Sequence, residues 1–240
     1  KHADLVMVNS PGYIEHVKAR GAREVALIPN GADPAMFDPA EDGAAFRQAQ
    51  GLEDRFVVLY AGAHGLSNDL DVVLDAAALL KDNLAIRIVF LGDGKEKPRL
   101  QIRATEMGLT NVLFLPPVPK SAMAEALAAS DACLAILKPI ELYKTTYPNK
   151  VFDYMAAGRP VILAIDGVVR QVIEEAQAGI SVTPGDPVSM AKAITDLASN
   201  PAKCRKMGKN GRLAIENKFS RIELAEKFTA LLETMRRRNA

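Results

Sequence analysis

Six apolar segments that alternate with helical segments predict an α/β protein built on a parallel sheet of six strands. Each segment is a short run of mostly apolar residues, the pattern of a strand that is buried on both faces. The six segments are residues 56–60, 86–91, 112–115, 132–137, 161–165 and 180–183. Because helices connect successive strands, the strands can run in parallel and be covered on both faces. The sequence therefore predicts a doubly wound, Rossmann-like sheet.

The helical segments between and after these strands complete the pattern. Several end at a glycine, which readily adopts the left-handed conformation that closes a helix, and Gly108 and Gly158 are examples. Helices are predicted over residues 46–50, 70–80, 95–107, 122–129, 149–157, 170–176, 188–198, 202–216 and 222–237. No internal repeat and no low-complexity tract interrupts this order.

The first 40 residues form a separate and incomplete pattern. They predict a strand at 5–8, a helix at 13–20 and a second strand at 25–28. Two strands and one helix cannot bury a sheet by themselves. The dense cluster of turn residues at 29–40 predicts an interdomain linker. Residues 1–4 run directly into the first strand without a signal peptide, so we expect that residue 1 is not the natural start of the protein.

The residue composition and net charge of the chain exclude several classes of protein. The chain has 240 residues, of which 49% are hydrophobic and 25% charged, as in an ordinary globular protein. A net charge of +1 provides no global attraction for nucleic acid, so no nucleic-acid partner is expected. Cys133 and Cys204 are isolated, which excludes a disulfide framework or a zinc motif and favours a reducing compartment. No apolar stretch approaches the length of a membrane span, about 20 residues.

Residues 143–160 form the most informative stretch of the chain. They connect two buried strands through a polar loop and a helix, and ligands of open α/β sheets bind at such loops. Lys150 lies in the first helical turn, where a cation opposes the helix dipole by roughly 0.3–1 kcal/mol unless an anion binds there. Asp153 follows on the same side. A cation for phosphate and a carboxylate for sugar hydroxyls would suit a nucleotide, and the alternative is a solvated lysine with an aspartate that suits the dipole.

Three other loops also follow predicted strands and would gather at the same sheet edge. They are Gly62-Ala63-His64-Gly65, Gly92-Asp93-Gly94 and the rigid stretch 116–119, Pro-Pro-Val-Pro. The glycines of the first loop allow a phosphate to approach backbone amides, although a simple turn is the alternative. His64 is expected either to donate to a diphosphate oxygen or to be a polar loop residue. The carbonyls of residues 116–119 could suit the edge of a nucleobase.

Motifs for other chemistries are missing from the sequence. It contains no serine elbow, no lysine of a P-loop, no metal-spaced cluster of histidine and aspartate, and no Asp-x-Asp metal motif. Arg236-Arg237-Arg238 close the last helix, where cations suit the helix dipole. A contact with an anionic membrane surface is the alternative use of these arginines.

Taken together, several short motifs resemble one family in order and spacing. They are Ala3-Asp4 with Asn9-Ser10, Ile28-Pro29-Asn30-Gly31-Ala32-Asp33 with Phe37, Tyr60-Ala61-Gly62 with His64-Gly65, Leu91-Gly92-Asp93-Gly94, and Pro148-Asn149-Lys150-Val151-Phe152-Asp153-Tyr154-Met155-Ala156-Ala157-Gly158-Arg159-Pro160-Val161-Ile162. The chain resembles the retaining, GT-B-fold glycosyltransferases of family 4, above all the bacterial branch that builds surface polysaccharides such as O-antigen and capsule.

This resemblance implies a division of the chain. Members have two Rossmann domains, of which the carboxy-terminal one holds the sugar nucleotide and the amino-terminal one most of the acceptor site. Residues 1–33 would be the tail of an acceptor domain whose remainder is missing, and 34–40 a linker. Residues 41–219 would be the nucleotide-sugar-binding domain, and 220–240 a helix that crosses towards the acceptor domain. The fragment alone is expected to be inactive.

The resemblance also assigns roles to residues. Asp153 matches the second of two family glutamates, whose carboxylate binds the ribose, and Thr145 stands at the first, which contacts the donor sugar. Ala63 and Asn68 replace the arginine and lysine that neutralise the diphosphate, so Lys150 is the substitute cation. Its expected support comes from His64 and the amides near Thr146. The catalytic candidates are Lys150, Thr145 and His64, and the binding candidates are Gly62, Ala63, His64, Gly65, Gly92, Asp93, Pro117, Val118, Thr145, Thr146, Asn149, Lys150 and Asp153.

The implied function is a cytoplasmic glycosyltransferase that transfers a hexosyl or N-acetylamino-sugar group. A peripheral place on the inner face of the plasma membrane is the optional addition to this localisation. Its donor would be a nucleotide-diphosphate sugar, with UDP favoured, and its acceptor a lipid-linked molecule or a saccharide. It would need no cofactor and no metal. Two alternatives remain: a sugar-nucleotide epimerase of the same architecture, and a non-catalytic module that binds nucleotide sugars.

Overall fold

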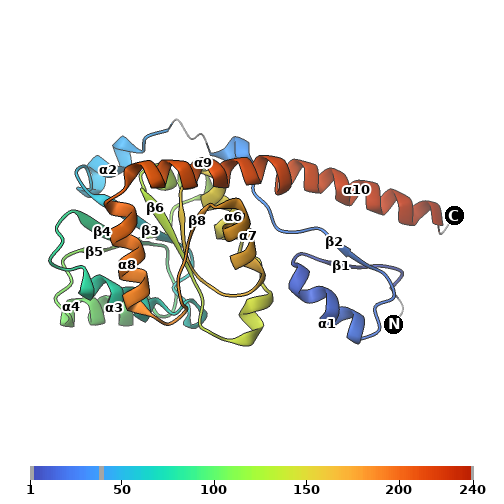
Figure 1. The fold of residues 1–240 in the computed structure, drawn as a ribbon, viewed down its shortest axis with the longest axis horizontal. Helices are drawn as coiled ribbons and strands as arrows, with labels where there is room; N and C mark the ends of the chain where they lie inside the picture. Colours follow the sequence, from blue (N-terminus) through green and yellow to red (C-terminus); the bar gives the residue numbers. More distant parts are fainter. Residues whose placement is uncertain (1–2, 38–40, 239–240) are drawn as a thin grey trace.

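A computed structural model describes residues 3–37 and 41–238 and shows the predicted six-stranded parallel sheet (Figure 1). The strands are β3 (Phe56–Ala61), β4 (Ile86–Leu91), β5 (Val112–Leu115), β6 (Ala132–Ile136), β7 (Val161–Ala164) and β8 (Gly179–Ser181). Their order across the sheet is β5-β4-β3-β6-β7-β8, so the direction of winding reverses between β3 and β6. The doubly wound α/β fold expected from the sequence is confirmed.

Helices cover both faces of this sheet because alternate residues of each strand point to opposite sides. Val58 and Tyr60 pack in one core, and Val57 and Leu59 pack in the other. The first core is covered by α3 (Leu70–Leu79), α4 (Lys97–Glu106) and α8 (Pro187–Ala198), and the second by α5 (Met123–Ala128), α6 (Asn149–Ala156) and α7 (Val168–Ala176). Helices α2 (Ala44–Gln50) and α9 (Pro201–Lys218) lie at the top of the domain in Figure 1, whereas α3 and α4 lie at the bottom.

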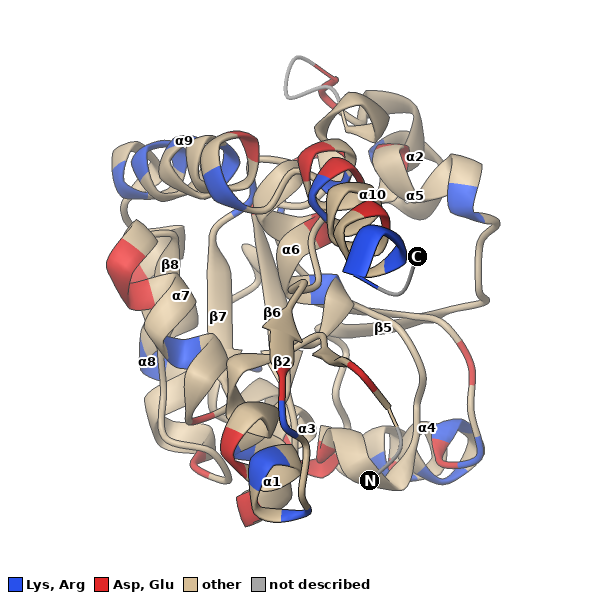
Figure 2. Ribbon diagram, turned by 90° about the vertical axis from the view of Figure 1, so that its right-hand side faces the viewer, with Lys and Arg blue, Asp and Glu red and all other residues tan. Residues whose placement is uncertain are grey.

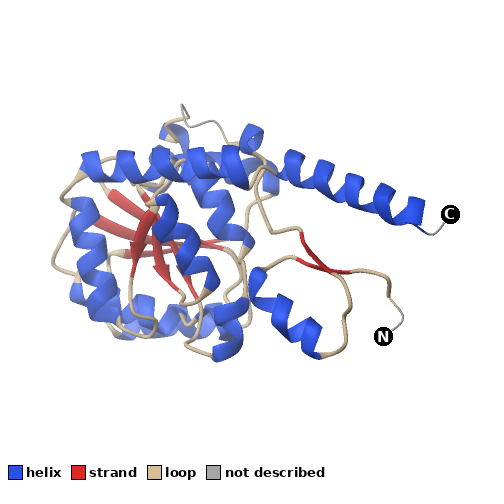
Figure 3. Cartoon of the chain, turned by 45° about the vertical axis from the view of Figure 1, so that its right-hand side comes forward, coloured by secondary structure: helices blue, strands red, loops and turns tan. Residues whose placement is uncertain are grey.

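The first residues form a small unit beside the large domain. Strands β1 (Val6–Val8) and β2 (Val25–Leu27) pair in parallel, with α1 (Ile14–Ala19) as their connection (Figure 3). The predicted domain boundaries stay predictions. Residues 1–2, 38–40 and 239–240 of those predicted segments lie outside the described residues.

The last helix, α10 (Arg221–Arg238), runs from the large domain past the amino-terminal unit (Figure 1). Arg238 at its end pairs with Glu24 at 2.8 Å, and the backbone N–H of Arg221 donates to the carbonyl of Ala32 at 2.9 Å. Three arginines, Arg236, Arg237 and Arg238, lie at its carboxyl end (Figure 2). None of the helices in the described part of the chain combines the length and the apolar character needed to span a bilayer.

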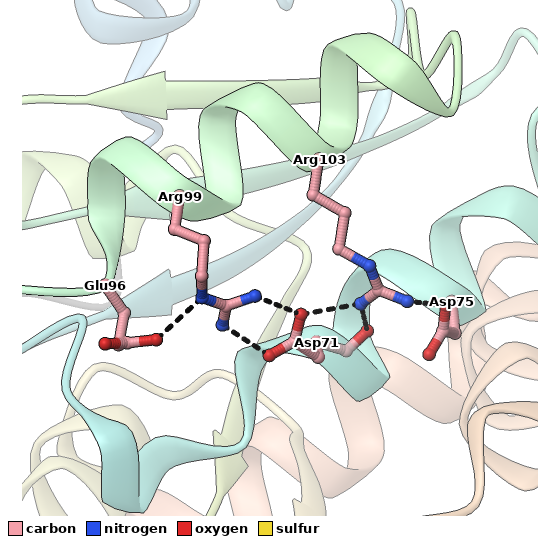
Figure 4. Close-up of polar contacts among 5 residues, drawn as sticks. All are labelled: Asp71, Asp75, Glu96, Arg99 and Arg103. Carbon is pink, nitrogen blue, oxygen red and sulfur yellow. Dashed lines mark hydrogen bonds and ion pairs between the residues drawn. The ribbon is translucent and has the colours of Figure 1, made fainter.

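An ion-pair network braces α3 against α4 next to the glycine loops (Figure 4). Asp71 accepts two hydrogen bonds from Arg99, at 2.9 and 2.6 Å, and one from Arg103 at 2.7 Å. Arg103 also reaches Asp75 at 2.7 Å, and Arg99 reaches Glu96 at 2.8 Å. Hydrogen bonding from Arg99 lowers the pKa of Asp71. Because these side chains are partly solvated, each pair contributes at most about 1 kcal/mol.

Candidate functional site

The two central strands separate at the point where the winding reverses. Strands β3 and β6 pair only through Val58 with Ala132 and Leu59 with Cys133. Beyond these pairs, the hydroxyl of Tyr154 on α6 makes two hydrogen bonds with the backbone of Ala61. It accepts from the N–H of Ala61 at 2.9 Å and donates to its carbonyl at 3.1 Å. The Tyr154 hydroxyl thus bonds the backbone N–H and carbonyl that a neighbouring strand would bond in a continuous sheet. Open α/β sheets bind ligands at this place, outside the carboxyl ends of the strands.

Replacing Tyr154 with phenylalanine should lower the free energy of unfolding by about 1–3 kcal/mol, because the buried N–H of Ala61 would lose its partner. Urea denaturation measures the change. Tyr143→Phe is the matched control, since the Tyr143 hydroxyl bonds the exposed Ser67 side chain at 2.8 Å and its loss should cost little. Equal stabilities of the two variants would contradict this role of Tyr154.

Lys150 places its ammonium group beside the first glycine loop. Its Nζ lies 4.0 Å from the centroid of the Tyr60 ring, and it forms no hydrogen bond or ion pair with any described residue. A Cβ on Gly62 would lie 2.7 Å from that nitrogen, which shows how closely Lys150 approaches the loop. The φ of +145° at Gly62 is the reason that glycine is favoured there. Burial lowers the pKa of Lys150 to about 7. A half-buried cation without an anionic protein partner is a ready site for an external anion.

The glycine loops after β3 and β4 pack against each other backbone to backbone. A Cβ on Gly92 would lie 2.1 Å from the carbonyl oxygen of Gly62, and one on Gly94 would lie 2.4 Å from that of His64. The N–H of His64 donates to the carbonyl of Asp93 at 2.8 Å. The two predicted loops therefore form one rigid surface.

Lys97 supports this surface and was not among the predicted site residues. Its Nζ donates to the carbonyls of Gly92, at 2.7 Å, and Leu115, at 2.8 Å, which ties together the ends of β4 and β5. Like Lys150, it lies in the first turn of a helix that follows a strand-end loop. That shared position is the signal that could have identified it.

The side chain of His64, in the first glycine loop, points into the core. It is fully buried among Tyr60, Phe90 and Phe114, with ring centroids 5.9 to 6.2 Å apart. Neither ring nitrogen has a hydrogen-bond partner in the described part of the chain. Burial, with a smaller effect from Lys97, lowers the pKa of His64 to about 4, so the ring is neutral. The imidazole is thus buried against three aromatic rings with both nitrogens unpaired among the described residues, and its donation to a diphosphate stays a prediction.

Asp153 lies one turn after Lys150 on α6 and is half-buried. Burial raises its pKa, while Arg221 and Lys120 have the opposite effect. Its carboxylate makes no hydrogen bond or ion pair within residues 3–37 and 41–238. The carboxylate is thus available to accept from hydroxyl groups of a ligand.

The threonines of the loop before α6 turn their hydroxyls back onto that loop. Thr145 Oγ1 donates to the carbonyl of Leu142 at 2.6 Å, and Thr146 Oγ1 donates to that of Tyr143 at 2.9 Å. Residues 141–145 form a 3-10 turn that the sequence did not predict. Both hydroxyl oxygens retain acceptor capacity for a ligand.

The remaining predicted residues lie on the expected loops. Ala63 offers its carbonyl to Tyr60 and Asn68, whereas Asp93 caps the N–H of Gly94 at 2.8 Å. The other predicted positions are Gly65, which follows His64, exposed Asn149 at the start of α6, exposed Pro117, and half-buried Val118. No hydrogen bond joins Pro117 or Val118 to the other candidates among the described residues. No group of three or more His, Cys, Asp or Glu side chains in those residues could hold a metal ion.

Comparison by sequence finds a match over most of the chain. Residues 42–214 match the family model described as Glycosyl transferases group 1. The D-inositol 3-phosphate glycosyltransferase of Streptomyces avermitilis is 28% identical over 240 residues, which covers 94% of this chain and 50% of that protein. The chain therefore spans about half the length of the curated relatives it matches.

Comparison by structure finds the same fold in solved glycosyltransferases. Anabaena HepE in complex with UDP has a TM-score of 0.86 at 21% identity, over 97% of this chain and 64% of that chain. WaaG, described as a glycosyltransferase involved in lipopolysaccharide biosynthesis, has a TM-score of 0.76 at 18% identity, over 94% of this chain and 61% of that chain. At these identities the likeness shows a shared fold.

Proposed function

The chain belongs to the glycosyl transferases group 1 family, and from that premise we propose that it forms the donor-binding part of a retaining glycosyltransferase of family 4. The donor is a nucleotide-diphosphate sugar with UDP as the nucleotide. The whole enzyme transfers a hexosyl or N-acetylamino-sugar group to a lipid-linked or saccharide acceptor. Neither a metal nor a cofactor takes part in this proposal.

The observation that carries the proposal is the placement of Lys150. Its ammonium group meets Gly62 where β3 and β6 separate, without a charged protein partner in the described residues. The diphosphate of the donor would bind there, and Asp153 would accept from the ribose hydroxyls one helical turn away. As the glycosidic bond breaks, negative charge grows on the leaving diphosphate, and a preorganised cation stabilises that charge more than it stabilises the donor.

Similarity to two solved structures supports the proposed donor and the proposed role in polysaccharide synthesis. HepE shares the fold over 97% of this chain and was solved with UDP. WaaG, whose described role is lipopolysaccharide biosynthesis, shares it over 94%. We propose surface polysaccharide synthesis in the cytoplasm, where Arg236, Arg237 and Arg238 would favour an anionic membrane face.

Calorimetric titration with UDP, GDP, dTDP and ADP tests the donor assignment. We expect UDP alone to bind, with the same affinity with and without magnesium. Asp153→Ala should weaken UDP binding by about 10- to 100-fold, because a hydrogen bond to a charged group is lost. Asp82→Ala, which removes an exposed carboxylate elsewhere, should leave the affinity unchanged. Binding of all four diphosphates alike, or full affinity in Asp153→Ala, would refute the assignment.

A further inference from the structure

We propose that Ser10 and Asn30 are positioning residues that set the place of the sugar-side loop, defined here as residues 141–148. This inference rests on the proposed function, because it concerns how the sugar of the donor is held. Ser10 Oγ donates to the carbonyl of Thr145 at 2.5 Å, and Asn30 Nδ2 donates to that of Tyr147 at 2.6 Å. Two side chains of the amino-terminal segment thus hold the loop on either side of Thr146.

The contact at Thr145 is tight. Ser10 is fully buried, and a Cβ added to Gly12 would lie only 2.5 Å from the Cα of Thr145. Gly12 lies in the 3-10 turn Pro11–Tyr13 and is not among the residues with positive φ. Glycine is needed at this position because of the close approach of the loop.

The geometry of Asn30 is itself fixed. Asn9 Nδ2 donates to Asn30 Oδ1 at 3.3 Å, which turns the amide nitrogen of Asn30 towards Tyr147. Two successive hydrogen bonds, through the side chains of Asn9 and Asn30, therefore connect the end of β1 to the loop. In an exposed loop without such contacts, backbone groups would fluctuate in solvent.

The large domain holds the sugar-side loop from its other sides. The Tyr143 hydroxyl bonds Ser67 Oγ at 2.8 Å, and a Cβ on Gly167 would lie 2.1 Å from the Lys144 carbonyl oxygen. The Tyr147 ring also packs against Phe152, with ring centroids 5.4 Å apart. The backbone carbonyls of Thr145 and Tyr147, however, are bonded by side chains of the amino-terminal segment. The sugar of the donor would therefore meet a correctly placed loop only when that segment is docked, which couples the two parts of the chain at the reacting end of the donor.

Two single substitutions remove the contacts, and a third is the matched control. Ser10→Ala deletes one donor, and Asn30→Asp replaces the other with an acceptor of the same shape. Glu24→Gln weakens the 2.8 Å pair with Arg238, which attaches the amino-terminal unit to α10 without touching the loop. Unfolding midpoints of all three variants show whether each one is folded before it is compared.

Hydrogen–deuterium exchange tests the positioning without any ligand. Peptides that cover 141–148 should exchange about tenfold faster in Ser10→Ala and in Asn30→Asp, because each loses one hydrogen bond that restrains the loop. Glu24→Gln should exchange at the wild-type rate in these peptides. Unchanged exchange in both Ser10→Ala and Asn30→Asp would overturn the proposal.

Calorimetric titration tests the consequence for the sugar, with UDP, UDP-glucose and UDP-N-acetylglucosamine as probes. Ser10→Ala and Asn30→Asp should weaken binding of the preferred UDP-sugar about tenfold and binding of UDP less than twofold. Equal changes for UDP and UDP-sugar would overturn the positioning role. If the wild-type chain binds none of the three probes, the proposed donor fails instead, and the exchange result still decides whether the two residues position the loop.

Discussion

Replacing Lys150 with alanine is expected to weaken binding of UDP by about 10- to 100-fold and to leave the weaker binding of uridine nearly unchanged. The ammonium group meets Gly62 and the Tyr60 ring, and burial alone shifts its pKa. A diphosphate would supply the anionic partner that the described residues do not provide. A nucleoside has no phosphate, so it cannot gain from this charge.

The same interaction should depend on pH. Burial lowers the pKa of Lys150 to about 7 in the folded chain, and a bound diphosphate would raise it again. Binding therefore takes up a proton at and above pH 7, and the affinity for UDP should fall as the pH rises from 7 to 9. For folding the sign is opposite: the unfolded chain binds more protons in this range, so the contribution of Lys150 to stability rises with pH.

Titrations in buffers of different ionisation enthalpy would measure that proton uptake directly. Lys95→Ala is the matched control, because Lys95 is an exposed lysine beside the second glycine loop. It should change UDP affinity only slightly, through weak and screened attraction. Equal losses for UDP and uridine in Lys150→Ala, or an affinity for UDP that is independent of pH, would exclude Lys150 as the diphosphate cation.

The sequence predicted those parts of the molecule that depend on local pattern. The six strands follow from continuous apolar runs, and the position of Lys150 and Asp153 on one side of α6 follows from helical periodicity. The glycine loops were expected at one sheet edge, since they follow parallel strands. Each of these inferences needs only neighbouring residues and a known topology.

Contacts between segments that are far apart in the sequence could not be predicted from local sequence patterns. The burial of His64 depends on Phe90 and Phe114, which lie on two other strands and fill the space under the loop. The bonds of Ser10 and Asn30 to the sugar-side loop span 135 and 117 residues of sequence. Periodicity carries no information about such pairs, because they depend on how the amino-terminal unit docks.

Gly92→Ala is expected to lower the free energy of unfolding by about 3 kcal/mol or more. Its φ of +142° disfavours any side chain, and the new Cβ would lie 2.1 Å from the carbonyl oxygen of Gly62. That neighbour is backbone, which cannot rotate away as the end of a side chain could. Either β4 or the first glycine loop must shift.

Gly108→Ala is the control substitution at a glycine with positive φ and no clash. Gly108 also has a positive φ, +64°, but a Cβ there would meet nothing within 4 Å. Its loss should be only about 1 kcal/mol, the cost of the backbone conformation alone. Urea denaturation of both variants then gives, by difference, the extra cost at Gly92 of the clash and of its more extreme φ. Because the clash in Gly92→Ala falls on Gly62, which lies beside Lys150, UDP binding should fall in that variant and not in Gly108→Ala. If Gly92→Ala is as stable as Gly108→Ala, the two glycine loops are not held together as rigidly as their contacts indicate.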